Sequence, residues 1–175
     1  MFVAGTVRAE VSFALAQPRL ARLARGHGLL GASQAAYGSG LTGLSGADPL
    51  GLPQVAEVVR VRLGDLTADG NTARVALRWE VAADGGLFAA LDADLTLAPP
   101  GNRVTTLTLA GVYRLPPGIQ GNGPGQAVVR GVAEATIQAF LDRVAAAITV
   151  PGPASEWNGG TRAQGGSAPP AAQAP

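Results

Sequence analysis

Cysteine is absent from the 175 residues of this chain, and lysine is absent as well, because all 13 basic residues are arginine. Without cysteine the chain has no disulfide bond, no thiolate nucleophile and no metal site built on sulfur, and it suits a reducing compartment. The 12 acidic residues leave a formal net charge of only +1. No segment concentrates the arginines, so we expect no nucleic-acid partner.

Long apolar runs are missing too. The longest uncharged stretch, residues 26–47, is rich in glycine, serine and threonine, and a stretch of that polarity does not cross a membrane. The first 16 residues alternate in polarity as a strand does, and they lack the apolar centre of a secretory signal. We therefore expect a cytoplasmic protein with no integral membrane segment.

Several segments alternate apolar and polar residues, which is typical of strands with one buried face. The clearest is 72–81, where the apolar parity consists of Ala73, Val75, Leu77, Trp79 and Val81. The same pattern predicts a first strand that ends before Gln17, and further strands over 55–63, 87–97 and 103–115. Short turns at 69–71, 84–86 and 99–102 predict that the last four strands form an antiparallel meander.

The segment 126–149 has polar residues at every fourth position and an apolar stripe opposite them, which predicts one long amphipathic helix. At 1.5 Å per residue it is about 36 Å long, enough to cross five strands, and we expect it to cover the sheet alone. A short helix is predicted over 18–25. In the glycine-rich 26–53 we expect a broken helix around 29–37 and then a loop.

These elements predict a single α+β domain over 1–149. It consists of an antiparallel sheet of about five strands wrapped around the long C-terminal helix, a helix-grip arrangement, with a short helical region after strand one. Residues 150–175 are rich in proline, glycine and alanine, and Trp157 is their only large apolar residue. Such a composition predicts a disordered tail.

This order of elements resembles the START-like or SRPBCC superfamily, the helix-grip fold of Bet v 1-type proteins and polyketide cyclases. The segments GLF at 86–88, LDADLTL at 91–97, GVYRLPPG at 111–118 and VAEAT at 132–136 look like those of a START-like branch from high-GC bacteria. The resemblance covers 1–149. It implies a cavity between helix and sheet for a hydrophobic small molecule, with chemistry in only some branches.

The residues predicted to line such a cavity are the large ones on the inner parity of the sheet and on the apolar stripe of the helix. They are Trp79, Leu91, Leu107, Leu109, Tyr113, Ile137, Phe140 and Val144. Only Glu57 and Arg103, near strand ends, place an ionisable group on that parity, so no acid–base catalyst is assigned. The alternative is that Trp79 and Tyr113 are ordinary core aromatics packed towards Phe140.

The glycines Gly38, Gly40 and Gly43 match the dinucleotide fingerprint G-x-G-x-x-G. That motif binds pyrophosphate only between a buried strand and the start of a helix, so we interpret it as a glycine-rich loop. His27 lies between two glycines, and we expect it to cap a helix or lie in a solvated loop.

The pair Asp92 and Asp94 brings two carboxylates to one strand face, which suits a metal ion. We favour ion pairs with Arg74 and Arg78 on the neighbouring strand instead. Free backbone amides in the glycine-rich segment 118–125, before the last helix, suit an anion, although a flexible connection is the simpler explanation, which we favour.

The sequence therefore predicts non-enzymatic binding or carriage of a hydrophobic small molecule, lipid- or polyketide-like, with no metal and no cofactor. The first alternative is a protein-interaction module with a closed core. The second is a small polyketide cyclase-like enzyme, which needs a polar cavity residue from the glycine-rich region, such as Tyr37, Ser39 or His27. Oligomeric state is left open.

Overall fold

The computed structural model describes residues 1–42, 59–81, 90–114 and 124–150. Within these residues the fold is α+β, as predicted. The elements in chain order are β1 (Phe2–Ala9), α1 (Phe13–Arg25), α2 (Gly28–Thr42), β2 (Val59–Asp69), β3 (Thr72–Val81), β4 (Ala90–Ala98), β5 (Thr105–Arg114) and α3 (Pro124–Thr149).

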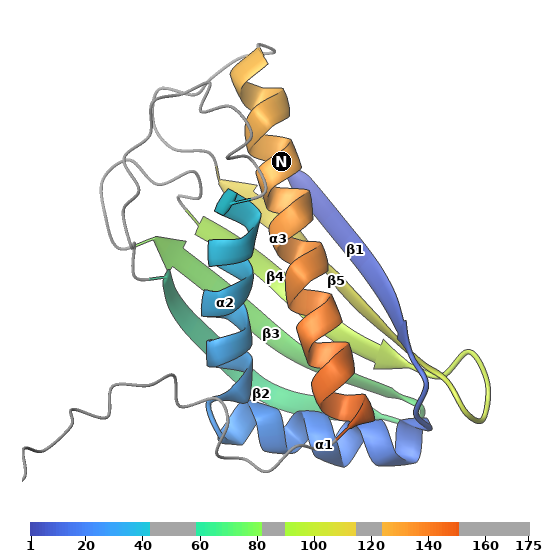
Figure 1. Ribbon diagram of the computed structural model, residues 1–175. Helices are drawn as coiled ribbons and strands as arrows, with labels where there is room; N and C mark the ends of the chain where they lie inside the picture. Colours follow the sequence, from blue (N-terminus) through green and yellow to red (C-terminus); the bar gives the residue numbers. More distant parts are fainter. Residues whose placement is uncertain (43–58, 82–89, 115–123, 151–175) are drawn as a thin grey trace, which may run out of the picture.

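The strands form one antiparallel sheet in the order β1-β5-β4-β3-β2. Strands β2 to β5 follow one another as a meander, which confirms the prediction from the short turns. The turn after β2 contains Gly70 at a φ of 53°, a conformation that glycine adopts without strain. The first strand closes the other edge by pairing with β5 (Figure 1).

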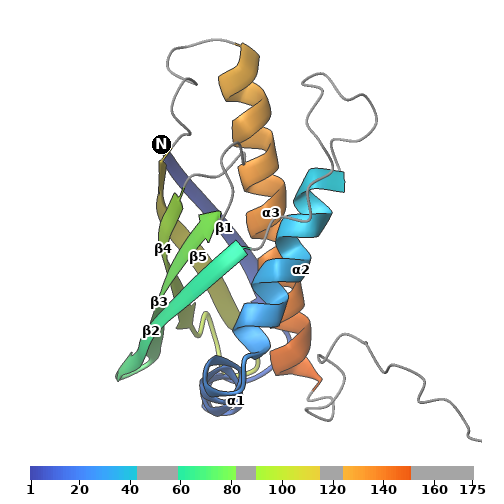
Figure 2. The same cartoon turned by 90° about the vertical axis from the view of Figure 1, so that its left-hand side faces the viewer.

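Helices α2 and α3 lie side by side over one face of the sheet, and α1 lies across one end (Figures 1 and 2). The sheet curves around α3, and strands β1 and β3, which are not neighbours in the sheet, both contact the helix. A Cβ at Gly5 of β1 would lie 2.8 Å from Ile137, whereas Trp79 of β3 contacts Phe140. This is the predicted helix-grip arrangement, and the glycine permits the close approach of β1.

The prediction that α3 covers the sheet alone, with a broken helix and a loop before β2, is wrong. Helix α2 is continuous over Gly28–Thr42 and shares the face, so Gly38 and Gly40 are helical rather than part of a loop. Its buried residues Leu29, Ala32 and Ala36 recur at helical spacing. Their burial against α3 outweighs the low helix propensity of the glycines.

The first helix also differs from the prediction. Helix α1 begins at Phe13 rather than at Pro18, so strand β1 ends at Ala9, well before Gln17. Pro18 lies inside the helix, where its missing N–H leaves one backbone hydrogen bond unmade. Ala16 and Leu20, one turn apart, are fully buried, and this packing keeps the segment helical around the proline.

Strand β2 extends six residues beyond its predicted end, because the pairing with β3 shifts between Leu63 and Leu66. A bulge adds a residue to one strand and interrupts the alternation of apolar and polar residues by which a strand is recognised in a sequence.

Arg103 precedes β5 and is exposed, which corrects its assignment to the inner parity. Helix α3 starts at Pro124, so proline occupies the first turn as expected.

Some predictions fall on residues that the structure does not describe. These are the start of the 55–63 strand with Glu57, the glycines Gly43, Gly118, Gly121 and Gly123, and the tail over 151–175.

Candidate functional site

The eight residues predicted to line a cavity belong to one buried cluster between the sheet and α3. Each of them is at most 2% exposed. They come from three adjacent strands, β3, β4 and β5, and from the face of α3 that the sheet covers. The structure thus brings together side chains that are up to 65 positions apart, from Trp79 to Val144. That they line a ligand site stays a prediction.

The centre of this cluster is an aromatic pair. The rings of Trp79 and Phe140 pack edge to face, with centroids 5.3 Å apart and planes at 79°. Such a pair adds about 0.5–1.5 kcal/mol beyond the area that it buries. It also fixes the direction of the indole ring, and therefore of its N–H group, within the apolar interior.

The indole N–H of Trp79 has no hydrogen-bond partner within the described part of the chain, and the same holds for the hydroxyl of Thr136. Trp79 is 2% exposed and Thr136 is fully buried. Because Thr136 precedes Phe140 by four residues, both side chains lie on the same face of α3. An unmade hydrogen bond at a buried polar group costs about 1–3 kcal/mol, so each of these two groups calls for an explanation.

Two other buried hydroxyls do have hydrogen-bond partners. Ser33 of α2 donates to the carbonyl of Leu29 at 2.7 Å, and Thr105 of β5 donates to the carbonyl of Val11 at 2.7 Å. Sequence reasoning missed Thr136 as a candidate residue. Its only signal is that a polar residue occupies the apolar stripe of the helix, between Val132 and Phe140.

Tyr113 contributes a second polar group to the cluster. Its hydroxyl lies 4.0 Å from the sulfur of Met1, and burial raises the pKa of the phenol. Arg130 lowers this pKa and Glu134 raises it, both with smaller effects than burial. The phenol is therefore neutral at physiological pH and acts as a hydrogen-bond donor.

Arg143 of α3 is a second polar residue, after Thr136, that the sequence did not single out. One guanidinium nitrogen donates to the hydroxyl of Ser39 at 2.8 Å, across the seam between α3 and α2. The Nε atom of Arg143 is buried and has no partner among the described residues. Nor does Arg143 form an ion pair with any described carboxylate.

The polar candidates of the glycine-rich region are spread over different places. His27 is exposed at the junction of α1 and α2, with a φ of 62°, so it lies outside the core. Tyr37 is buried in the core cluster, and Ser39 lies at the helix seam with Arg143. The structure therefore does not bring these three residues together at one reaction centre.

The outer face of the sheet carries the charges. Asp92 pairs with Arg78 at 3.5 Å and with Arg114 at 3.0 Å, and Asp94 pairs with Arg74. These contacts confirm the interpretation of the two aspartates as ion-pair partners. A hollow of about 630 Å³ lies over this face, lined by residues that include Phe2, Ala76 and Asp94.

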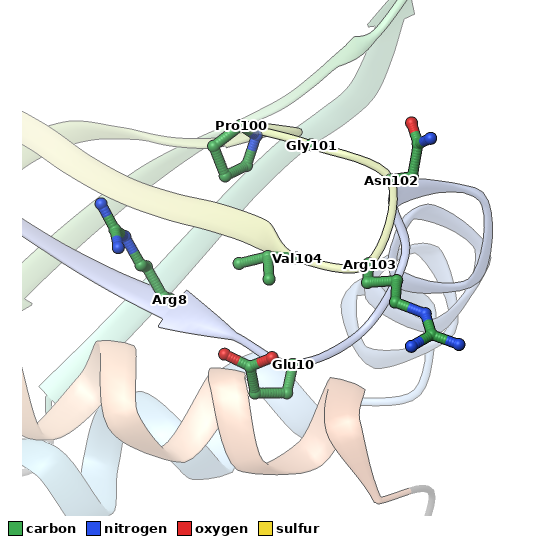
Figure 3. Close-up of a pocket in the computed structure, with 7 residues that line it drawn as sticks. All are labelled: Arg8, Glu10, Pro100, Gly101, Asn102, Arg103 and Val104. Atoms are coloured by element: carbon green, nitrogen blue, oxygen red, sulfur yellow. The ribbon is translucent and has the colours of Figure 1, made fainter.

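A smaller hollow of about 410 Å³ lies beside the loop between β4 and β5 (Figure 3). Its side chains include Arg8, Glu10 and Arg103, and the close-up shows Asn102 and Arg103 directed away from its centre. Both hollows lie outside the space between the sheet and α3.

Among the helices within the described ranges, none has both the length and the apolar character that crossing a bilayer requires.

No protein-family model matches the chain, and no curated protein sequence does. Two solved structures are similar in fold. One is the ZhuI aromatase/cyclase of a Streptomyces species, at 13% identity and a TM-score of 0.40, covering 85% of this chain and 93% of that chain.

The other is the Thermus thermophilus protein TTHA0849, at 16% identity and a TM-score of 0.39, covering 84% of this chain and 99% of that chain. Both are distant similarities that concern the overall fold.

Proposed function

We propose that the protein binds a hydrophobic small molecule, lipid- or polyketide-like, between the sheet and α3, without catalysing a reaction on it. The observation that carries this proposal is that two buried donors, the Trp79 indole N–H and the Thr136 hydroxyl, have no partner among the described residues. A carbonyl or ether oxygen of a bound molecule accepts a hydrogen bond from such a donor. The surrounding aliphatic and aromatic side chains accommodate its apolar body.

The composition of the buried cluster favours binding over catalysis. Its members are hydrophobic, and the buried polar residues of the described chain are Ser33, Thr105 and Thr136. Proton transfer needs a group that titrates near the working pH. Tyr113, whose pKa burial raises further, does not provide one. The groups present donate hydrogen bonds, which orients a ligand but leaves its covalent bonds unchanged.

Ligand retention tests the proposal directly. The purified protein is analysed by native mass spectrometry, and its organic extract by liquid chromatography and mass spectrometry. We expect an apolar molecule that remains bound through purification. Prodan, a naphthalene with one ketone and an environment-sensitive fluorescence, then serves as a probe of defined chemistry, and it should bind with a blue-shifted emission.

Two substitutions with the same chemistry separate a ligand-binding hydroxyl from a structural one. Thr136→Val removes a hydroxyl without a partner, so prodan affinity should fall about tenfold, while the free energy of unfolding of the empty protein stays equal or rises. Thr105→Val removes a hydroxyl that is bonded to Val11. It should lower the free energy of unfolding by about 1–3 kcal/mol and leave prodan affinity unchanged.

The proposal is wrong if the extract is empty and prodan fails to bind to the wild-type protein. It is also wrong if Thr136→Val destabilises the protein as Thr105→Val does, without any effect on prodan. In that case the hydroxyl of Thr136 has a structural role.

A further inference from the structure

Three buried side-chain atoms lack a hydrogen-bond partner in the described chain, two on one strip of α3 and one on β3. They are Nε1 of Trp79, Oγ1 of Thr136 and Nε of Arg143. Thr136 and Arg143 are seven residues apart, two helical turns, so they lie on the same face about 10.5 Å from each other along the axis. Trp79 reaches this strip between them through its contact with Phe140.

The strip faces α2 at one end and the sheet at its centre. Arg143 contacts Ser39 of α2 at 2.8 Å, and Phe140 contacts Trp79 of β3 at a centroid distance of 5.3 Å. Helices α2 and α3 lie side by side along this seam (Figure 2). A molecule that occupies the strip therefore has an apolar part near Phe140 and an end at the partly exposed guanidinium of Arg143.

The charge at Arg143 needs a counter-ion. Arginines on the outer face of the sheet, such as Arg74, Arg78 and Arg114, each pair with a carboxylate. Arg143 is less exposed than Arg74 and Arg114, yet its partner among the described residues is a neutral hydroxyl. Partly buried charges are normally paired, and an arginine binds a carboxylate through two adjacent N–H groups.

We infer that the ligand of this protein is an apolar carboxylic acid, whose carboxylate is held by Nε and a terminal nitrogen of Arg143. This inference rests on the proposed function, because it names the chemical class of the molecule bound at the same site. Its apolar chain extends from Arg143 towards Phe140. Farther along the ligand, an oxygen accepts a hydrogen bond from Thr136 or Trp79.

The test compares an acid with its neutral ester. The probe is cis-parinaric acid, a fluorescent C18 carboxylic acid, and the reference is its methyl ester. We expect the wild-type protein to bind the acid at least tenfold more tightly than the ester. Arg143→Met keeps the length of the aliphatic stem but removes the charge. It should abolish the difference between the two probes, because binding of the acid falls at least tenfold.

Two further variants make the result specific. Arg143→Lys restores the positive charge without the planar fork, so a preference for the acid should return in part. Arg130→Met is the matched control, because Arg130 also lies on α3 but is 52% exposed and lies 4.0 Å from Glu134. Its removal should leave the preference for the acid intact.

The possible outcomes separate the two claims. Equal affinities for acid and ester in the wild-type protein overturn the carboxylate inference and leave the proposed function standing. A preference that persists in Arg143→Met, or disappears equally in Arg130→Met, overturns the role of Arg143. If acid, ester and prodan all fail to bind, the proposed function itself fails.

Discussion

The two faces of the sheet differ in whether their polar groups have partners. On the outer face three arginines and two carboxylates form a chain of ion pairs that crosses β2, β3, β4 and β5, and Arg74 and Asp94 form a separate pair. On the inner face, where an unmade hydrogen bond costs more, the Trp79 indole and the Thr136 hydroxyl have no partner within the described structure. Water satisfies polar groups on the outer face, so their pairing carries little information about function.

The inner face differs because each unpartnered donor there lowers stability. Most buried polar groups in proteins are bonded, and exceptions commonly mark sites where a ligand or water completes the arrangement. Buried donors without hydrogen-bond partners are therefore a better indication of the candidate site than the number of charged residues on a face.

The largest expected effect comes from truncating the centre of the inner face. Phe140 is fully buried and packs edge to face on Trp79. Phe140→Ala should lower the free energy of unfolding by about 3–5 kcal/mol in urea titrations followed by circular dichroism, through lost apolar contact and a residual cavity. Val112→Ala on the outer face, where Val112 is 50% exposed, is the control and should change it by less than about 0.5 kcal/mol. Similar losses in both variants would contradict the assignment of the two faces.

A smaller effect is expected from pH. Burial raises the pKa of Tyr113 in the folded protein above its unfolded value of about 10. The folded state thus holds this proton to higher pH than the unfolded state. The stabilisation is complete below pH 10 and is lost as pH rises through the folded pKa.

The alkaline range is unusually simple in this chain. Lysine and cysteine are absent and only 2 tyrosines are present, so these are the side chains that titrate between about pH 9 and 12. Urea unfolding at pH 8 to 11.5 should show stability falling above pH 10 in the wild-type protein, and a flatter profile for Tyr113→Phe. Equal slopes in the two proteins would show that burial of Tyr113 is not the cause.

The smallest effect should come from the outer face. Asp92→Asn removes the shared carboxylate between Arg78 and Arg114, which are 43% and 65% exposed. Exposed ion pairs contribute about 0–1 kcal/mol, and salt screens them. We expect a loss of unfolding free energy within this range that shrinks in 1 M NaCl. A loss of more than about 2 kcal/mol that is insensitive to salt would contradict the contrast between the faces.

The sheet and the last helix were predictable because their signals are local. The alternation of Val75, Leu77 and Trp79 reports which parity is buried, and the stripe on 126–149 reports which side of the helix faces the sheet. The pairing of Asp92 and Asp94 with arginines of β3 also followed, since adjacent antiparallel strands bring residues of one parity together.

Helix α2 and the bulge in β2 were not predictable in the same way. The helical segment containing Gly38 and Gly40 has weak intrinsic helix propensity, and packing of Leu29 and Ala36 against other elements stabilises it. The bulge between Leu63 and Leu66 inserts a residue at a position that pairing with β3 determines. In both cases the deciding contacts come from distant parts of the chain.

The sequence by itself determined the fold class, the five strands and the eight apolar residues that meet between the sheet and α3. The spacing of apolar residues along a strand or helix shows which of its faces is buried, whichever element packs against that face. Only the tertiary structure decided that Thr136, Trp79 and Arg143 each retain a polar atom without a partner among the described residues. Whether a buried donor finds an acceptor depends on which backbone and side-chain atoms surround it after folding, and those atoms come from other elements.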